Sequence, residues 1–223
     1  MLSRRLVGLV CGLALAGGAT WAVAQAQPPS DVRDGAVAVI GENPGIRLSV
    51  KEGAPPSTSV SFWRVFYSPA GMGHVCFVTS DIGGDGPTPD DIRLAFADNE
   101  KLAEYVATRL MTAFDKTYGS RPFPVRRARF ARSGDTATAW KETIDADQFS
   151  IELVWRDFYE PFAIESRVGV PDNPYLITST FIPARTAEVI VNGRRVTGSA
   201  TQRMRGTRQS SSAFLAFAET WLQ

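Results

Sequence analysis

A glycine- and proline-rich loop carries the densest group of carboxylates in the chain. Residues 81–91 read Asp-Ile-Gly-Gly-Asp-Gly-Pro-Thr-Pro-Asp-Asp. Ca²⁺ takes several oxygen ligands at one point, and a flexible turn lets backbone carbonyls join the side-chain carboxylates. Asp81, Asp85 and Asp91 are therefore the candidate ligands of a calcium ion.

The same loop matches the EF-hand pattern only in part. Asp81, Asp85 and Gly86 fall at positions one, five and six, but Gly83 takes position three. Ile92 stands at position twelve, where an EF-hand has a bidentate glutamate. This departure favours a solvated loop and no cofactor, with the calcium site as the alternative.

His74 and Glu152 are the candidate acid–base residues. A histidine works as a general base when a carboxylate orients its ring. His74, the only histidine, begins the run His-Val-Cys-Phe-Val, in which strand alternation puts it on the same face as Cys76. Same-face neighbours on a strand are roughly 7 Å apart, so we expect no direct proton transfer between the two. A structural histidine beside a buried, inert thiol is the favoured alternative.

Motifs of the common enzyme classes are missing. The sequence contains no Gly-x-Ser-x-Gly elbow, no His-Glu-x-x-His pair and no glycine-rich phosphate loop. Catalysis would have to rely on unmarked residues such as those above.

Charged residues interrupt several runs that otherwise read as packed strands. They are Arg64, Arg126, Arg127, Arg129 and Arg167, together with Glu142, Glu152, Glu165, Glu188 and Glu219. If the turn at 133–135 pairs Arg132 with Thr136, Arg126 lies opposite Glu142 in an exposed pair worth ~0.2–1 kcal/mol. The favoured interpretation is a solvated sheet face.

A ligand cavity inside a barrel is the sharper interpretation of the same charges. Binding sites combine an apolar wall with a few placed polar groups. Trp63, Trp140 and Trp155 would form such a wall and Arg126 would supply a polar contact, although tryptophans are more often plain core. Five arginines near the C-terminus suggest a surface for anionic lipid, cell-wall polymer or an acidic partner, with plain surface solvation as the favoured alternative. They are Arg194, Arg195, Arg203, Arg205 and Arg208.

Strands must position most of these residues. Runs rich in β-branched and aromatic residues predict strands over 59–67, 75–79, 92–96, 148–156, 176–182, 187–191, 195–204 and 213–222. Asn192-Gly193 is the strongest two-residue hairpin signal. A second hairpin is predicted to join 125–132 to 136–144 through Ser133-Gly134-Asp135.

One amphipathic helix is predicted around 99–118. Leu102, Val106, Leu110 and Phe114 recur at a spacing of four and form an apolar stripe. Asp98 or Asn99 can cap the first turn by accepting free backbone N–H groups. We expect the stripe to lie across a sheet or to close the end of a barrel.

The first 26 residues read as a secretory signal peptide. A basic start at Arg4-Arg5 precedes an uncharged apolar run that is short for the ~20 residues of a membrane span. Small residues suit cleavage after Ala24 or Ala26, which predicts a signal peptide over 1–24, a flexible tail over 25–34 and a single domain over 35–223. A retained membrane anchor is the alternative; no later stretch suggests a transmembrane segment.

Processing would also change charge and thiol content. The net charge moves from +1 to about −1, and Cys11 is lost, so no internal disulfide can form. Near-neutrality argues against nucleic acid as a partner.

These patterns predict a mainly β protein, α+β at the margin, built as an antiparallel β-barrel or sandwich with one helix packed on it. The arrangement is similar to lipocalin-type architecture, a likeness of fold that implies little about function. We expect a periplasmic or secreted module that binds a small, partly apolar ligand or an envelope component. The alternatives are a periplasmic lyase, isomerase or hydrolase, and a structural or interaction protein of the cell envelope.

Overall fold

Antiparallel strands dominate the computed structural model, which describes residues 35–86, 91–170 and 173–223. Contacts group the chain from Gly35 to Gln223 into one unit. The strands are β1 Val37–Glu42, β2 Gly45–Ser49, β3 Thr58–Tyr67, β4 Gly73–Ser80, β5 Ile92–Ala97, β6 Val125–Arg127, β7 Arg129–Gly134, β8 Ala139–Ala146, β9 Phe149–Phe158, β10 Phe162–Val170, β11 Asn173–Val191, β12 Arg194–Arg195, β13 Ser199–Ala200, β14 Gln202–Arg205, β15 Arg208–Ser211 and β16 Ala213–Leu222.

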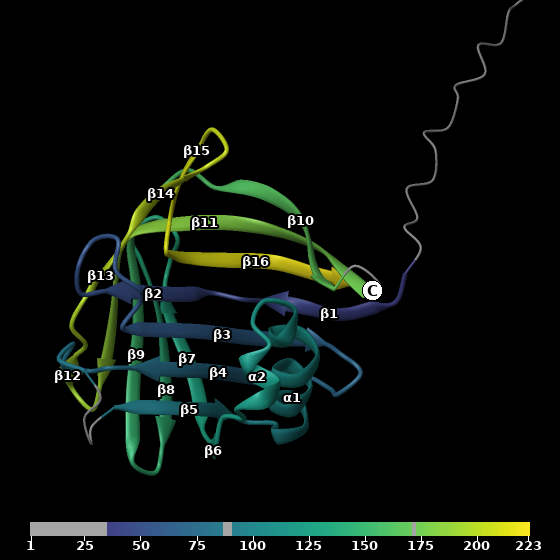
Figure 1. Ribbon diagram of the computed structural model, residues 1–223, viewed down its shortest axis with the longest axis horizontal. Helices are drawn as coiled ribbons and strands as arrows, with labels where there is room; N and C mark the ends of the chain where they lie inside the picture. Colours follow the sequence, from purple (N-terminus) through teal and green to yellow (C-terminus); the bar gives the residue numbers. More distant parts are fainter. Residues whose placement is uncertain (1–34, 87–90, 171–172) are drawn as a thin grey trace, which may run out of the picture. The chain divides into compact units, whose positions relative to one another are not determined.

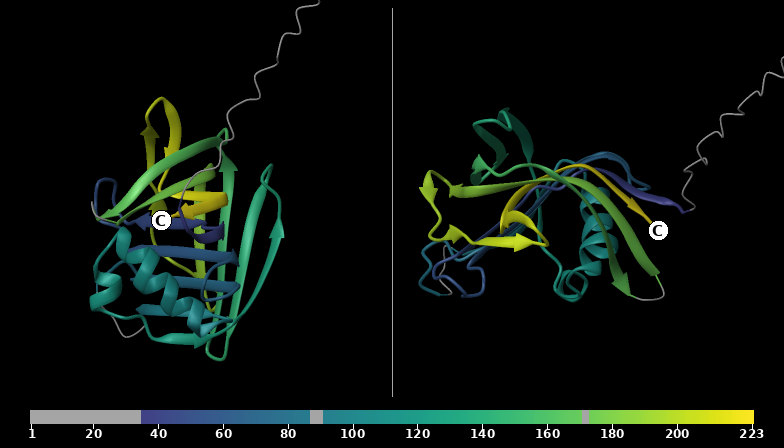
Figure 2. Two further views of the ribbon diagram at one scale, coloured as in Figure 1. Left: turned by 90° about the vertical axis from the view of Figure 1, so that its right-hand side faces the viewer. Right: turned by 90° about the horizontal axis from the view of Figure 1, so that it is seen from above.

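One large sheet contains most of these strands, in the order β6-β5-β4-β3-β1-β16-β11-β9-β8-β7. It folds over so that β7, β8 and β9 cross behind β2, β3, β4 and β5 (Figure 1). The helices lie against the other face of β3, β4 and β5 (Figure 2). The mainly β fold class and its antiparallel sheet are therefore confirmed.

The long strand β11 connects the two layers. Its first half pairs with β10 and β16, and its second half pairs with β9. The change of partner occurs at Pro183–Ala184, where Pro183 is opposite Phe214 and Ala184 is opposite Phe158. Such switching strands form the corners when two layers pack at a steep angle. The sequence predicted two separate strands here, because the corner interrupts the apolar pattern.

The two ends of the sheet are consecutive in the chain. β6 pairs with β5 and β7 pairs with β8, and Ala128 alone separates β6 from β7. The N–H of Ala128 donates to the carbonyl of Ala97 (2.9 Å), which holds this crossing against β5. We call the junction of β6, β7 and the β8–β9 turn the seam, because β6 and β8 are not paired there.

Two apolar cores fill the spaces between the layers. The first lies between the two sheet layers and contains Phe62, Cys76, Phe96, Ile144, Leu153 and Trp155. The second lies beneath the helices and contains Trp63, Phe77, Leu102, Val106, Leu110 and Trp221. The space between the sheets is therefore packed with side chains.

The predicted helix is present but shorter and irregular. It comprises α1 Glu100–Tyr105, the π-helix η1 Val106–Leu110 and the 3-10 turn η2 Met111–Ala113, and α2 Thr117–Ser120 is separate. The hydroxyls of Thr108 and Thr112 donate to the carbonyls of Glu104 and Thr108 (both 2.8 Å), an arrangement that bends helices. Leu102, Val106 and Leu110 pack on the sheet as expected. Phe114 lies beyond η2 and is 52 % exposed, so the predicted span to 118 and the last residue of the stripe were wrong.

Asn99 caps the helix, as predicted, and its replacement gives a first test. Its side chain accepts from the N–H of Leu102 (3.2 Å) and also donates to the carbonyl of Met72 (3.0 Å). We expect Asn99→Ala to destabilise the fold by about 1 kcal/mol, because the cap donor loses its acceptor. Urea denaturation measures this, and an unchanged midpoint would contradict it.

The two predicted hairpins had different outcomes. Asn192 and Gly193 adopt φ angles of 51° and 78° and connect β11 to β12, as the pair predicts for a tight turn. The β7–β8 hairpin also forms, but its register was wrong. Asp135 accepts from the N–H groups of Ala137 and Thr138, which lengthens the turn.

The longer turn changes the partner of Glu142. Arg132 lies opposite Glu142, and the predicted partner, Arg126, belongs to β6.

Within the described ranges, no helix is long and apolar enough to cross a membrane. The predicted signal peptide and tail lie outside these ranges.

Candidate functional site

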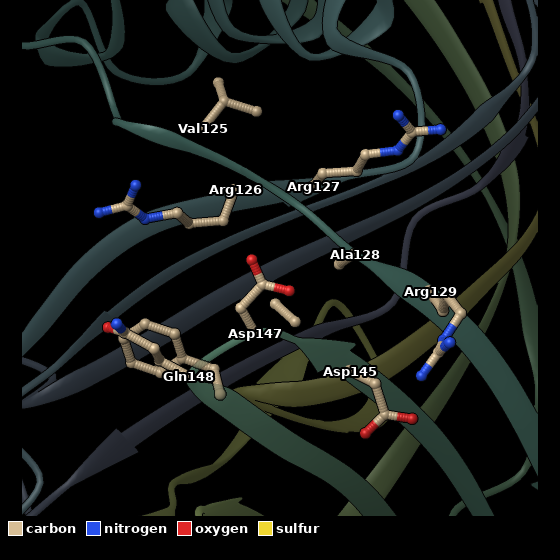
Figure 3. A pocket seen from close by; sticks show the side chains of 10 residues that line it. Val125, Arg126, Arg127, Ala128, Arg129, Asp145, Asp147 and Gln148 are labelled. Atoms are coloured by element: carbon tan, nitrogen blue, oxygen red, sulfur yellow. The ribbon is translucent and has the colours of Figure 1, made fainter.

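The seam contains a groove of about 740 Å³. One wall is formed by residues 125–129 and the other by residues 145–149, which include the β8–β9 turn. Figure 3 shows Arg126 and Arg127 extending in opposite directions from β6, with the carboxylate of Asp147 between them. Arg129 and Asp145 lie at the β7 end of the groove (Figure 3).

Five charged side chains therefore line this groove: Arg126, Arg127, Arg129, Asp145 and Asp147. Among the described residues, none of the five has an ion-pair partner within 4.0 Å, even though Arg129 and Asp145 are opposite in the β7–β8 ladder. Side chains of this kind are available for an external ligand.

A second groove of about 690 Å³ adjoins the first and shares Arg127 with it. Its other lining residues come from the β3–β4 turn, the end of β5 and the first turn of α1. They include Met72, Asp98 and Lys101. Arg127 thus separates two neighbouring hollows on the surface.

His74 connects this second groove to a buried charge network. Its Nε2 accepts from Nε of Arg64 (3.0 Å), and its Nδ1 lies 2.7 Å from Oδ2 of Asp98. A guanidinium can only donate, so Nε2 is the unprotonated nitrogen that accepts, and Nδ1 donates its proton to Asp98. The ring also stacks on Phe130, with 4.9 Å between centroids. Because both ring nitrogens are engaged in hydrogen bonds, His74 offers no free nitrogen to a substrate in this arrangement.

Arg64 is the centre of that network. It donates to Glu42 (2.8 Å) through Nη1 and to both carboxylate oxygens of Glu142 through Nη2 (3.2 and 2.9 Å). Glu142 is fully buried and also accepts from the indole N–H of Trp140 (3.0 Å). Burial raises the pKa of Glu142 to about 7, and the Arg64 charge and the Trp140 hydrogen bond limit the rise.

Glu219 is a second buried carboxyl, located in the core beneath the helix. It accepts from the indole N–H of Trp221 (2.6 Å) and from Nδ2 of Asn43 (3.3 Å). Among the described residues it has no cation within 4.0 Å. Burial raises its pKa to about 7, opposed by these hydrogen bonds.

A β-bulge brings Glu219 to this position. The β11–β16 register shifts between Thr178 and Thr180, and Ala218 adopts a φ of 50°. Ala213 and Leu215 pack in the core between the sheets, whereas Trp221, after the bulge, packs in the core beneath the helix. The extra residue of the bulge therefore changes which of the alternate side chains of β16 face each core.

The candidate catalytic pair is not brought together. His74 lies on the face of β4 that contacts Arg64 and Phe130. Glu152 alternates with the buried Ile151 and Leu153 on β9, so its side chain faces away from the core. On that outer face it pairs with Lys141 (3.0 Å).

The structure brings together only two of the four candidate ligand-binding residues: Trp140 lies opposite Trp155 in the β8–β9 ladder and packs against the same core. Trp63 and Trp155 are fully buried, in different cores. Trp140 is half-buried and contacts Glu142. Arg126 lies at the seam groove. The three tryptophans therefore do not share one wall.

The acidic loop satisfies one of its own carboxylates internally. Asp81 accepts from the N–H groups of Gly84 (2.7 Å), Asp85 (3.3 Å) and Gly86 (3.0 Å). Over the described ranges, which omit residues 87–90 of this loop, no group of three potential ligands is placed to hold a metal ion. The calcium site at Asp81, Asp85 and Asp91 remains a prediction.

No known family model matches the chain. No curated protein matches it either. The geometry of its own residues therefore carries the functional argument.

Several notable residues were not identified as sites from the sequence. Arg64, Glu142 and Glu219 appeared only as strand-borne charges expected on a solvated face. For Glu142 a signal existed: it stands two residues from both Trp140 and Ile144, so it shares a face with apolar residues. Asp145 and Asp147 gave no such signal, because their importance depends on the seam.

Proposed function

We propose that the chain is a binding module, and that its ligand carries anionic groups and occupies the seam groove. What supports this is that a hollow of ligand size is lined by three arginines, none of which forms an ion pair with another described residue. Guanidinium groups bind carboxylates and phosphates in charge-assisted hydrogen bonds. Export to the periplasm or the exterior, inferred from the first 26 residues, remains part of the proposal.

The packed interior favours the surface groove over a central cavity. A lipocalin-like lumen would need empty space between the sheets. That region is filled by buried side chains such as Phe62, Leu153 and Trp155. We therefore place the ligand at the seam, where Arg126 keeps its predicted role and the tryptophans do not.

The enzyme alternative has weaker support. It needs a carboxyl or histidine of altered pKa within a cavity. Glu142 and Glu219 have raised pKa values, but neither lines the seam groove or the second groove. His74 has both ring nitrogens engaged.

The C-terminal arginines are also weaker candidates for a binding surface. Arg195 pairs with Glu188 (3.4 Å), Arg208 pairs with Glu160 (3.1 Å), and Arg205 donates to Ser166 (3.1 Å).

A thermal-shift screen tests the proposal with dicarboxylic acids, sugar phosphates and acidic peptides as probes. A ligand at a hundred times its Kd stabilises a protein by about 2.7 kcal/mol. For a domain of this size, that raises Tm by roughly 5–10 °C. We expect Arg126→Glu to lower the affinity for the best ligand about tenfold or more, which halves the ligand-induced rise in Tm or removes it.

The matched control is Arg167→Glu, the same charge change at an exposed site on β10. It should leave the shift unchanged. Equal losses in both variants would indicate a general charge effect, and the groove would not be the site.

A further inference from the structure

We propose that the ligand of the seam groove is an acidic peptide segment of a partner protein, which binds in extended form as an additional strand on the free edge of β6. This inference rests on the proposed function and narrows it to one class of ligand.

β6 has a free edge because β5 is its one hydrogen-bonded neighbour within the described residues. On the β5 side, the carbonyl of Pro124 accepts from the N–H of Ala95 (3.0 Å) and the N–H of Ala128 donates to Ala97 (2.9 Å). Backbone groups of alternate residues point to opposite edges of a strand. The backbone N–H and C=O groups of Val125 and Arg127 therefore face away from β5. Each of these residues offers one hydrogen-bond donor and one acceptor to a further strand.

The groove lies beyond this free edge. Its lining comes from residues 125–129 and 145–149, and no residue of β5 contributes to it. A hollow over the face of the β5–β6 pair would be lined by both strands. The available space is thus beside β6, with the β8–β9 turn and Asp147 across from it (Figure 3).

The charges of β6 favour acidic side chains on both faces of the added strand. Arg126 is paired with Phe96 of the core between the sheets, whereas Arg127 is paired with Ala97 of the core beneath the helix. The two guanidinium groups therefore lie on opposite faces of β6. Side chains of paired residues in adjacent strands point to the same face, so two consecutive acidic residues would contact both arginines.

The wall of the groove opposite β6 carries negative charge, which favours binding of the acidic peptide on the β6 side. Asp145 and Asp147 repel carboxylates from the β8–β9 turn. Acidic side chains are thereby kept next to β6, where backbone pairing also occurs.

The test uses a fluorescein-labelled hexapeptide, Val-Thr-Glu-Glu-Thr-Val, with blocked ends. Fluorescence anisotropy compares it with a lysine analogue, in which lysine replaces both glutamates, and with a version N-methylated at every residue. We expect binding of the acidic peptide and roughly tenfold or more loss on N-methylation, because the methyl groups remove the strand hydrogen bonds. The lysine analogue should not bind.

Two protein readouts locate the interaction on β6. Amide hydrogen exchange by NMR should slow at Val125 and Arg127 when the acidic peptide is added. Val125→Pro removes one groove-facing N–H and leaves the β5 ladder intact, since proline is tolerated on strand edges. We expect Val125→Pro to lower the affinity for the acidic peptide severalfold, while Arg167→Glu leaves this affinity unchanged.

The outcomes separate this inference from the proposed function. Equal binding after N-methylation, with no protection at Val125 and Arg127, overturns strand addition and leaves the groove as a charge-binding site. If small anions bind through Arg126 but no peptide binds, strand addition is likewise overturned and the groove remains a charge-binding site. Protection of both amides before peptide is added assigns the edge to another segment of this chain and overturns the inference. Failure of every probe overturns both proposals.

Discussion

Replacing Arg64 with methionine is expected to destabilise the fold by about 3–5 kcal/mol at pH 8. Arg64 is the shared cation of Glu42 and of the fully buried Glu142. Methionine fills much of the same volume, but it leaves the buried Glu142 carboxylate without the cation that it contacts, with the Trp140 indole N–H as its remaining donor. Urea denaturation measures the loss. It should shrink near pH 5, where an unpaired Glu142 is protonated and its charge no longer has to be buried.

Arg132→Met is the matched control, because Arg132 donates to the same Glu42 (3.3 Å) from an exposed position. An exposed pair contributes at most about 1 kcal/mol. The double variant Arg64→Met/Glu142→Gln should recover part of the loss, since the buried charge is then absent. If Arg64→Met proved no more harmful than Arg132→Met, Glu142 would not depend on the Arg64 charge.

Replacing Glu219 with glutamine is expected to change how stability depends on pH. The pKa of Glu219 is raised from 4.5 to about 7 by burial, so the folded state holds its proton to a higher pH than the unfolded state does. Its stabilising contribution is complete below about pH 4.5 and is lost as the pH rises through about 7. The linked free energy is on the order of 3 kcal/mol. Glu142 acts in the same direction, because its pKa is also raised to about 7.

The variant removes the Glu219 part of this dependence. The stability of Glu219→Gln relative to wild type should therefore rise by about 3 kcal/mol between pH 4.5 and 8. Denaturation at a series of pH values measures the difference, and Glu104→Gln, at an exposed helix position, should leave the wild-type profile unchanged. Trp221 donates to Glu219 (2.6 Å), so its fluorescence should titrate near pH 7 in wild type only. A constant difference across the series would show that Glu219 keeps its charge when buried.

His74 links the buried network to Asp98, which lines the second groove beside the seam groove. Asp98 lines the second groove and contacts His74, which accepts from Arg64. Arg127 lines both grooves. The network that holds β3, β4 and β8 together therefore reaches the second groove through Asp98, and that groove borders the seam groove at Arg127.

Local patterns were sufficient to predict many elements of the fold. The aromatic and β-branched runs predicted β3, β9 and β16, because alternation with a period of two reports burial on one face. Asn192-Gly193 predicted its turn, and Asn99 its cap, because both act through neighbouring backbone groups. The span of the helix was wrong, because the apolar stripe does not report the π-helical and 3-10 turns that end the helical run at Ala113.

Register and face were decided by interactions that a local pattern does not contain. The longer turn at Asp135 shifts the β7–β8 register, so that Glu142 lies opposite Arg132 and not opposite the predicted Arg126. Arg64 reaches Glu142 from a strand 78 positions away in the sequence. The bulge at Ala218 reversed the alternation of β16, so no counting of alternate residues could place Glu219 beneath the helix.

The sequence by itself therefore determined the class of fold: apolar alternation and turn residues act over a few positions and specify strands, hairpins and a capped helix. The tertiary structure alone decided the candidate site. The groove exists because the two ends of one sheet meet at Ala128, which brings Arg126 and Arg127 next to Asp145 and Asp147. Sheet closure depends on the combined twist and packing of all the strands between these ends, and that sum is not readable from any one segment.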